Sequence, residues 1–346
     1  MSAPVPSPAD FAAHGWQGPI PGHSPSGGRG APPHTFSIGL SPLRPGTFPH
    51  RDALFDAYVA EKRRLASVCF GDVFVAAPGT EDAQREVAEL LAAQGAYAPG
   101  APAQGAHAPA CVPAAKRTTA DAAAPAGISP PLWRAALGVQ EDLVIMSRRH
   151  APERGVPEVG VLELGASEGA WWLAAGAVCF PSAWRLREKF LKPMHAVHAQ
   201  VPGFGPGTRQ ASMIERIFAG LVPDQPVERL NWSIDLQPEL HKPDADELQF
   251  ADTAAAGSAW LRVERQTLHK LPASGDVLFT IRIYENGLEQ LRAHPDAARI
   301  AAGLARLVHG LSEPQAAYKG LQQARGALLA LLESTAHPDP SGGAEG

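Results

Sequence analysis

The sequence predicts an α+β fold in which a mostly antiparallel sheet is flanked by helices near both ends of the chain. Between residues 142 and 284, short apolar runs alternate with turn residues, a pattern typical of strands. Outside this stretch, apolar residues recur at helical spacing over 54–66 and from residue 297 onwards. With 346 residues, of which 45% are hydrophobic, the chain is long enough to bury a sizeable core.

Each element is predicted from its own pattern. Strands are expected over residues 143–146, 159–164, 171–180, 227–235, 259–268 and 277–284. Helices are expected over residues 54–66, 81–91, 185–190, 211–221, 297–311 and 314–332. The first helix ends on a basic cluster, Lys62-Arg63-Arg64, which favours a helix C-terminus there because cations stabilise the negative end of the helix dipole.

Three segments are rich in Pro, Gly and Ala and lack apolar periodicity. Such a composition cannot bury enough apolar surface to offset the entropy lost on ordering. We therefore expect a disordered N-terminal segment over 1–35, a disordered tail over 334–346, and one folded domain over 36–333. That domain would carry a low-complexity insertion at about 92–126.

Composition excludes several classes of protein. The net charge of −5 argues against a nucleic-acid-binding surface. Three widely separated cysteines argue against both a disulfide framework and a cysteine-ligated iron–sulfur cluster, and fit a reducing compartment. No apolar run approaches the roughly 18 residues of a membrane span, and the N-terminus has no apolar signal-peptide core. We expect a cytoplasmic protein.

Two short motifs leave alternatives open. The run Gly165-Ala-Ser-Glu-Gly169 matches the G-x-S-x-G pattern of serine hydrolases, which requires a following helix. A strand is predicted to follow instead, which favours a hairpin turn over a nucleophilic Ser167. His195 and His198 are three residues apart, so on a helix they would share a face and could hold a metal. Two unrelated histidines at a helix end remain the simpler interpretation.

Charged and amide residues inside the predicted strands are the most informative feature of the chain. Over 230–235, alternation places Asn231 on one face and Trp232 on the other. Over 261–268, Arg262, Glu264 and Gln266 share one face, whereas Arg265 lies on the opposite face. One interpretation is a ladder of salt bridges to a neighbouring strand. The other is a set of fixed donors aimed at a bound anion, a role that guanidinium groups suit well.

Several blocks occur in one order along the chain. They are Gln-Glu-Asp-Leu at 140–143, Val-Cys-Phe-Pro-Ser-Ala-Trp at 178–184, Val-Pro-Gly at 201–203 after His198, Asn-Trp-Ser at 231–233, Leu-Arg-Val-Glu-Arg-Gln-Thr-Leu at 261–268, and Leu-Phe-Thr-Ile at 278–281. In this order they resemble the haem-binding (alpha) subunit of haem-dependent oxidative N-demethylases, of the dimethylamine monooxygenase type. The resemblance covers about residues 36–311.

The resemblance implies a PAS-like domain that binds haem b and oxidises a small secondary amine with dioxygen, releasing formaldehyde. Electrons would come from NAD(P)H through FMN and an iron–sulfur centre in a separate reductase subunit, and a folate-binding subunit could capture the formaldehyde. This chain has no dinucleotide fingerprint and no cluster of cysteines, so it could supply only the haem site. The alternative is a non-catalytic PAS-like sensor that binds haem or another ligand.

The resemblance also suggests roles for individual residues. His198 is the expected axial ligand of the iron, with His195 as the second choice. Further haem-binding residues would be Ser182, Asn231, Trp232 and Arg262. The expected catalytic residues are Arg265 and Gln266, which would orient a haem propionate or bound oxygen, and Glu264 and Asp142, which are candidate partners of a protonated amine. We expect Arg265, rather than Arg262, to face the ligand pocket.

Overall fold

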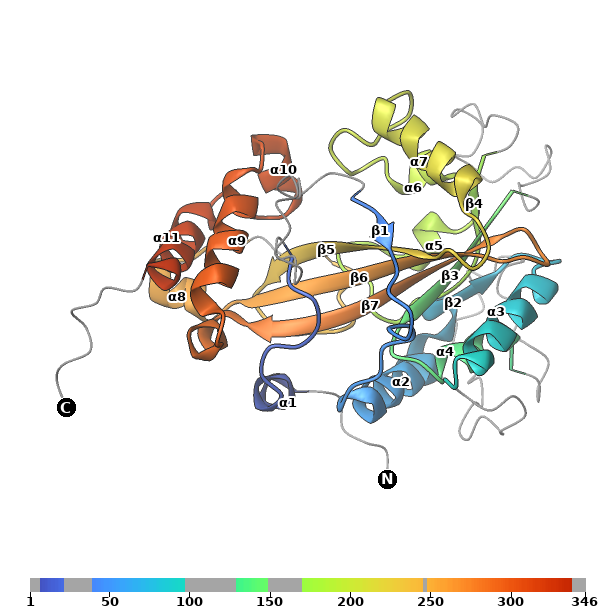
Figure 1. The fold of residues 1–346 in the computed structure, drawn as a ribbon, viewed down its shortest axis with the longest axis horizontal. Helices are drawn as coiled ribbons and strands as arrows, with labels where there is room; N and C mark the ends of the chain where they lie inside the picture. The colour runs from blue at the N-terminus through green and yellow to red at the C-terminus, as the bar shows by residue number, and fades with distance from the viewer. Residues whose placement is uncertain (1–6, 22–38, 97–128, 149–169, 245–247, 338–346) are drawn as a thin grey trace.

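The computed structural model describes residues 7–21, 39–96, 129–148, 170–244 and 248–337 (Figure 1). These residues build a seven-stranded sheet with the strand order β1-β5-β6-β7-β3-β4-β2. Every neighbouring pair in it is antiparallel. The strands are β1 (Ser41–Pro42), β2 (Phe74–Ala76), β3 (Asp142–Ser147), β4 (Trp172–Ala177), β5 (Val227–Asp235), β6 (Trp260–Lys270) and β7 (Val277–Gly287). The predicted α+β class with an antiparallel sheet is therefore confirmed.

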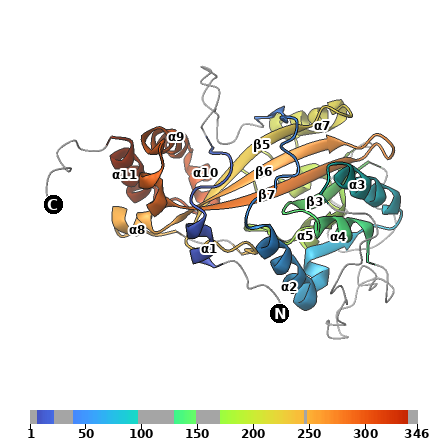
Figure 2. The ribbon, with the colours of Figure 1, turned by 60° about the horizontal axis from the view of Figure 1, so that its bottom comes forward.

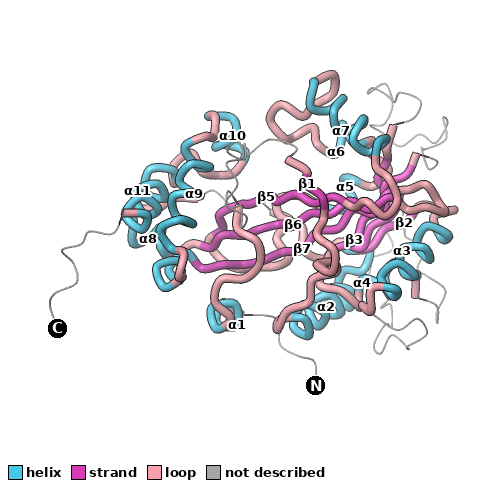
Figure 3. The backbone as a smooth tube through the Cα atoms, in the orientation of Figure 1, coloured by secondary structure: helices cyan, strands magenta, loops and turns pink. Residues whose placement is uncertain are grey.

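Strands β5, β6 and β7 are the longest (Figure 3). The alternation of side chains along them defines the two faces of the sheet. In the register, Asn231 lies opposite Glu264, and Glu264 lies opposite Ile283. The side chains of these three residues therefore lie on one face. Arg265 pairs with Arg282 in the next rung, so both arginines project from the other face.

Helices cover the two faces of the sheet separately. Figure 1 shows α2 (Phe55–Val73), α3 (Glu81–Ala93) and α4 (Pro131–Ala136) below the sheet, with α6 (Met194–Val197) and α7 (Arg209–Gly220) above it. The short α5 (Leu186–Lys189) connects β4 to the upper layer. The lower layer closes a core that includes Leu91 of α3, Trp133 of α4 and Ile145 of β3.

A second core lies at the far end of β5–β7, where the C-terminal helices pack (Figures 1 and 2). These helices are α8 (Thr253–Gly257), η3 (Leu288–Ala293), α9 (Ala297–His309), α10 (Glu313–Tyr318) and α11 (Arg325–Ala336). The single helix predicted over 314–332 is wrong, because the chain forms two helices there. Gly320, with φ +68°, ends α10 in the left-handed conformation that glycine adopts without strain.

Helix α2 is longer than predicted because its basic cluster does not mark a helix end. Lys62 is fully buried, and its ammonium donates hydrogen bonds to the carbonyl oxygens of Ala136, Val139 and Glu141. The helix continues to Val73, with non-helical backbone angles at Cys69. The basic residue thus ties α2 to the chain that enters β3.

The expectation of disorder over 1–35 is wrong for residues 7–21. Helix α1 (Pro8–Ala13) starts with a capping box between Ser7 and Asp10. Phe11 is only 2% exposed and packs edge-on against Tyr58 and Trp260. From the surrounding composition, the entropy lost on ordering was expected to exceed any gain from burial. The burial of one aromatic side chain offsets that loss. Helix α11 likewise continues to Ala336, inside the predicted disordered tail.

Some predictions fall outside the described residues. These are the strand over 159–164, the turn at 165–169 with Ser167, and most of the insertion at 92–126. Within the described residues, no helix is both long enough and apolar enough to cross a membrane.

Candidate functional site

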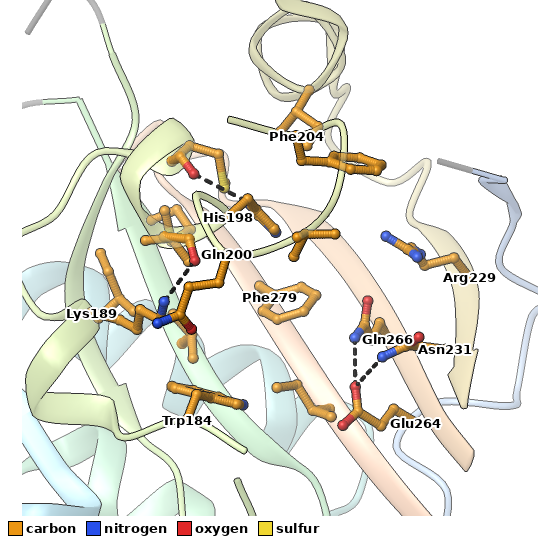
Figure 4. Close-up of a pocket in the computed structure, with 18 of the residues that line it drawn as sticks. Trp184, Lys189, His198, Gln200, Phe204, Arg229, Asn231, Glu264, Gln266 and Phe279 are labelled. Atoms are coloured by element: carbon orange, nitrogen blue, oxygen red, sulfur yellow. Dashed lines mark hydrogen bonds between the residues drawn. The ribbon is translucent and has the colours of Figure 1, made fainter. Parts of the chain in front are cut away.

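A pocket of about 250 Å³ lies between the sheet and the layer formed by α6 and α7 (Figure 4). The apolar part of its floor comes from the central strands and includes Val144, Met146, Leu268 and Phe279. Its roof includes Met194, Phe204, Ile214 and Phe218. Ile214 and Phe218 are four residues apart on α7, so both point to the same side of the helix. Two apolar walls facing one another suit a flat hydrophobic ligand.

His198 projects into this pocket from the residue that caps α6. Its Nδ1 lies 3.0 Å from the carbonyl oxygen of Met194, and the amide of Met194 donates to the carbonyl of Trp171 just before β4. Because a carbonyl only accepts, Nδ1 carries the proton and Nε2 keeps its lone pair. Burial lowers the pKa of His198 to about 4, so the ring is neutral at pH 7.

This geometry is compatible with a metal-ligating histidine. The second ring nitrogen is held by a carbonyl, which fixes the tautomer and the ring orientation. Among the described residues, Nε2 of His198 has no hydrogen-bond partner, and no group of three or more His, Cys, Asp or Glu side chains could hold a metal ion. A ligand with its own equatorial donors, such as a haem, needs only one such histidine.

A polar cluster lies on the pocket floor beside these apolar residues. The side-chain amides of Asn231 and Gln266 both donate to Oε2 of Glu264, at 3.2 and 2.9 Å. Asn231 and Glu264 are cross-strand neighbours on β5 and β6, which places their side chains within reach. The second oxygen, Oε1, has no hydrogen-bond partner among the described residues. The cluster therefore presents an oriented carboxylate with one oxygen available to a ligand.

The pocket is positively charged, although the whole chain carries a net charge of −5. Its ionisable lining residues are Lys189, Arg229 and Lys319 against the single carboxylate of Glu264, a net charge of +2 with His198 neutral. Figure 4 shows Lys189 and Arg229 at opposite sides of the pocket. Lys189 donates to the carbonyl of Val197 at 2.9 Å. An anionic ligand would be stabilised here.

The family of the chain follows from a comparison with known proteins. The model of the family described as haem-dependent oxidative N-demethylase, alpha subunit-like, matches residues 39–329. The chain belongs to this family. The matched range contains every residue that lines the pocket, from Leu40 to Lys319.

The residues of this N-demethylase family member fit the haem that the family implies. Apolar walls on both sides would contact the porphyrin faces, and the free Nε2 of His198 can ligate iron. Nε of Arg229 is buried without a hydrogen-bond partner, and an anionic propionate would supply one. The donor set therefore matches a ligand that is flat, apolar and iron-containing at its centre and anionic at its edge.

Five of the residues expected from the sequence meet in the pocket. They are Ser182, His198, Asn231, Glu264 and Gln266. His195 does not line the pocket, because α6 is only four residues long and His198 follows it with non-helical backbone angles. The two histidines therefore do not share a helix face.

The expectation that Arg265 faces the pocket is wrong. Alternation sends Arg265 to the opposite face of β6, where its Nε donates to Glu228 and its terminal nitrogens donate to Thr47. Arg262 is on the same face as Glu264 but is fully buried beyond the pocket. Its terminal nitrogens donate to Glu285 at 2.7 Å and to the carbonyl of Phe180 at 2.7 Å. Neither arginine lines the pocket.

Asp142 and Trp232 are also outside the pocket. The two oxygens of Asp142 accept hydrogen bonds from the amides of Cys179 and Phe180, at 2.9 and 2.8 Å, and burial raises the pKa of Asp142 to about 6. The carboxylate thus holds the chain that leaves β4. Trp232 packs with the C-terminal helices on the other side of β5. Asp142 is therefore not available to an amine in the pocket.

Three lining cations were missed from the sequence. Arg229 could have been found from the sequence, since it lies two residues before Asn231 and therefore on the same face of β5. No sequence pattern indicated Lys319, because it reaches the pocket from the end of α10, far from the other lining residues in the sequence. Lys189 lies in a short helix whose direction only the packing of the chain determines.

Proposed function

We propose that this chain is the haem-binding subunit of an enzyme that oxidatively N-demethylates a small secondary amine, such as dimethylamine, with release of formaldehyde. Membership of the family supports the haem-dependent oxidative class. The observation that carries the proposal is that one apolar pocket contains both a neutral histidine with a free Nε2 and a carboxylate with a free oxygen. The first suits iron, and the second suits a protonated amine.

In this proposal a PAS-like domain holds haem b between the sheet and α7, with His198 as the protein ligand of the iron. The haem, when bound, supplies activation of dioxygen and the oxidative chemistry. Phe279 and Leu268 on the floor and Phe218 on the roof would exclude water from a bound haem. Asn231 and Ser182 line the same space and are candidates for polar contacts with its edge.

Glu264 binds the amine and receives its proton. A secondary amine is protonated at neutral pH, and an ammonium needs a carboxylate partner in an apolar pocket. The amides of Asn231 and Gln266 hold Oε2 of Glu264, so that Oε1 accepts from the ammonium without further reorganisation. Oxidation at a methyl group next to nitrogen requires the nitrogen lone pair, and Glu264 is the acidic side chain of the pocket that can take the proton.

Electrons must come from partner proteins in this proposal. The three cysteines of the chain lie far apart in the sequence, which does not suit an iron–sulfur cluster. We propose that NAD(P)H reduces a separate subunit containing FMN and an iron–sulfur centre, which passes electrons to this one in the cytoplasm. A folate-binding subunit would take up the formaldehyde.

The experiment is reconstitution of the purified chain with haem, followed by addition of the reductase subunit, NADH and dimethylamine in air. The proposal requires a Soret band and formaldehyde in proportion to NADH consumed. A Soret band with ligand binding but no formaldehyde from any secondary amine would support a non-catalytic sensor instead. Failure to bind haem would overturn the proposal.

A further inference from the structure

Arg229 is half-buried and differs from the buried arginines of the molecule. It projects from β5 into the pocket, opposite Gln266 in the strand register (Figure 4). Its Nε is buried without a hydrogen-bond partner, as are the Nε atoms of Arg262 and Arg282, but its terminal nitrogens also have no acceptor among the described residues. By contrast, Arg262, Arg265 and Arg282 each pair with a carboxylate, from Glu285, Glu228 and Asp52 respectively. Among the described residues, Arg229 thus has no carboxylate bonded to it.

The surroundings of Arg229 would stabilise a negative charge. Burial lowers the pKa of Arg229, and the attraction of Glu264 is the main opposing effect. Glu264 is already engaged by two amides, and Lys319 adds a second cation to the same pocket. A guanidinium removed from water without a partner is unfavourable, and a bound anion offsets that cost.

We propose that Arg229 binds the carboxylate of a ligand in this pocket. The inference rests on the proposed function, in that it takes the pocket to be the ligand site. A guanidinium fork matches a carboxylate with two parallel hydrogen bonds, which an ammonium cannot reproduce. The structure is compatible with two sources of that carboxylate, a haem propionate or the carboxylate of an N-methyl amino acid substrate.

The second source follows from the spacing of the two side chains. Arg229 is opposite Gln266, and Glu264 is two residues along β6, so the two charged groups are diagonal neighbours on one face. An amino acid with a methylated nitrogen could place its ammonium on Glu264 and its carboxylate on Arg229. Dimethylamine has no carboxylate that could pair with Arg229.

The test compares the native chain with Arg229→Gln and Arg229→Lys, and uses Arg216→Gln as the control. Arg216 is exposed on α7, so its variant has the same change in net charge without touching the pocket. Each protein is titrated with haem and with haem dimethyl ester, whose propionates are uncharged, and the Soret band gives the dissociation constants. Haem-loaded proteins are then titrated with N-methylglycine and with dimethylamine, and spectral shifts report binding.

A propionate site predicts that Arg229→Gln weakens haem binding roughly 10- to 100-fold and leaves binding of the ester unchanged, the range expected for loss of a charge-assisted hydrogen bond. A substrate-carboxylate site predicts a loss of similar size for N-methylglycine, with haem and dimethylamine unaffected. In both cases Arg229→Lys recovers only part of the loss and Arg216→Gln behaves as native. Unchanged affinities for haem and N-methylglycine in Arg229→Gln would overturn the inference.

A merely structural role and a failure of the proposed function give different results. The ligand-free Arg229→Gln protein should melt at the native temperature or higher, because the substitution removes an unpaired cation. A lower melting temperature together with native ligand affinities would show that Arg229 only supports the fold. If the native chain binds no haem, calorimetry with N-methylglycine on the ligand-free protein tests Arg229 alone. Absence of Arg229-dependent binding there would also overturn the inference.

Discussion

Two clusters of charged residues lie on the same face of β6, only two residues apart. One centres on Arg262, which is fully buried and has hydrogen-bond partners at both terminal nitrogens, including Glu285 and the carbonyl of Phe180. We call it the closed cluster. The other centres on Glu264, with Asn231, Gln266 and Arg229, and it faces the pocket. We call it the open cluster.

The difference between the two clusters distinguishes charged residues that stabilise the fold from charged residues that can bind a ligand. In the closed cluster Nε of Arg262 and Oε2 of Glu285 are buried without partners, but both terminal nitrogens of Arg262 donate to groups of the protein. These bonds hold the segments around residues 180 and 240 against the sheet. In the open cluster, Oε1 of Glu264 and the guanidinium of Arg229 have no hydrogen-bond partner among the described residues. A charge inside a strand is therefore no sign of function by itself. A charged group that is fixed in orientation, faces the pocket and has no hydrogen-bond partner there does indicate ligand binding.

The same comparison applies to the histidines, where we expect a substitution to have the largest effect on haem binding. His269 is buried and His198 is half-buried, and desolvation lowers the pKa of each to about 4. Nε2 of His269 lies 2.8 Å from Oγ1 of Thr267, whereas Nε2 of His198 is free among the described residues. We predict that His198→Ala abolishes haem binding, measured by Soret titration, while His269→Ala and His195→Ala retain it. Native haem affinity in His198→Ala would reject the assignment of the iron ligand.

Arg262→Leu should lower the free energy of unfolding by about 3–5 kcal/mol, because it leaves the carboxyl group of Glu285 buried without its partner. Urea denaturation of the ligand-free protein measures this change. Glu264→Gln provides the comparison from the open cluster and should change the same quantity by less than about 1 kcal/mol, since no ion pair of the fold is lost. Equal destabilisation by the two substitutions would remove the distinction between the clusters.

Glu264→Gln should instead weaken binding of dimethylamine to the haem-loaded protein roughly 10- to 100-fold, as expected for loss of a charged hydrogen bond worth about 1.5–3 kcal/mol. The spectral shift on titration with the amine measures this affinity. Glu313→Gln removes a carboxylate from an exposed ion pair with Arg325 and is the matched control, with native affinity expected. If both variants bind the amine as the native protein does, another group holds the ammonium.

The smallest expected effect, counted per pH unit, concerns the pH dependence of stability. A histidine whose folded-state pKa of about 4 lies below its unfolded value near 6.5 binds fewer protons when folded. Between those values the unfolded state takes up the extra proton, so stability falls as the pH is lowered from about 6.5 to 4. The ligand-free native protein should therefore lose stability relative to His198→Phe by up to about 1.4 kcal/mol per pH unit in this window. Urea denaturation across pH tests it, and parallel curves would contradict it.

Much of the sheet could be predicted from local pattern. The predicted strand over 227–235 has the observed bounds of β5, and helix α9 begins at the predicted residue, Ala297. These elements were predictable because side-chain periodicity follows directly from backbone geometry. The prediction from local composition was wrong for α1, because the burial of Phe11 decides whether this segment is ordered. The contacts that bury Phe11 join segments that are far apart in the sequence.

The sequence by itself determined which residues share a strand face and, through the ordered blocks, the family of the chain. Alternation placed Arg262, Glu264 and Gln266 on one face, and the structure confirms it. Only the tertiary structure decided that Glu264 meets a pocket, that Arg262 meets Glu285, and that Arg265 meets Glu228 on the other side. The physical reason is that periodicity specifies the direction of a side chain relative to its neighbours, whereas its partners come from distant segments brought together by folding.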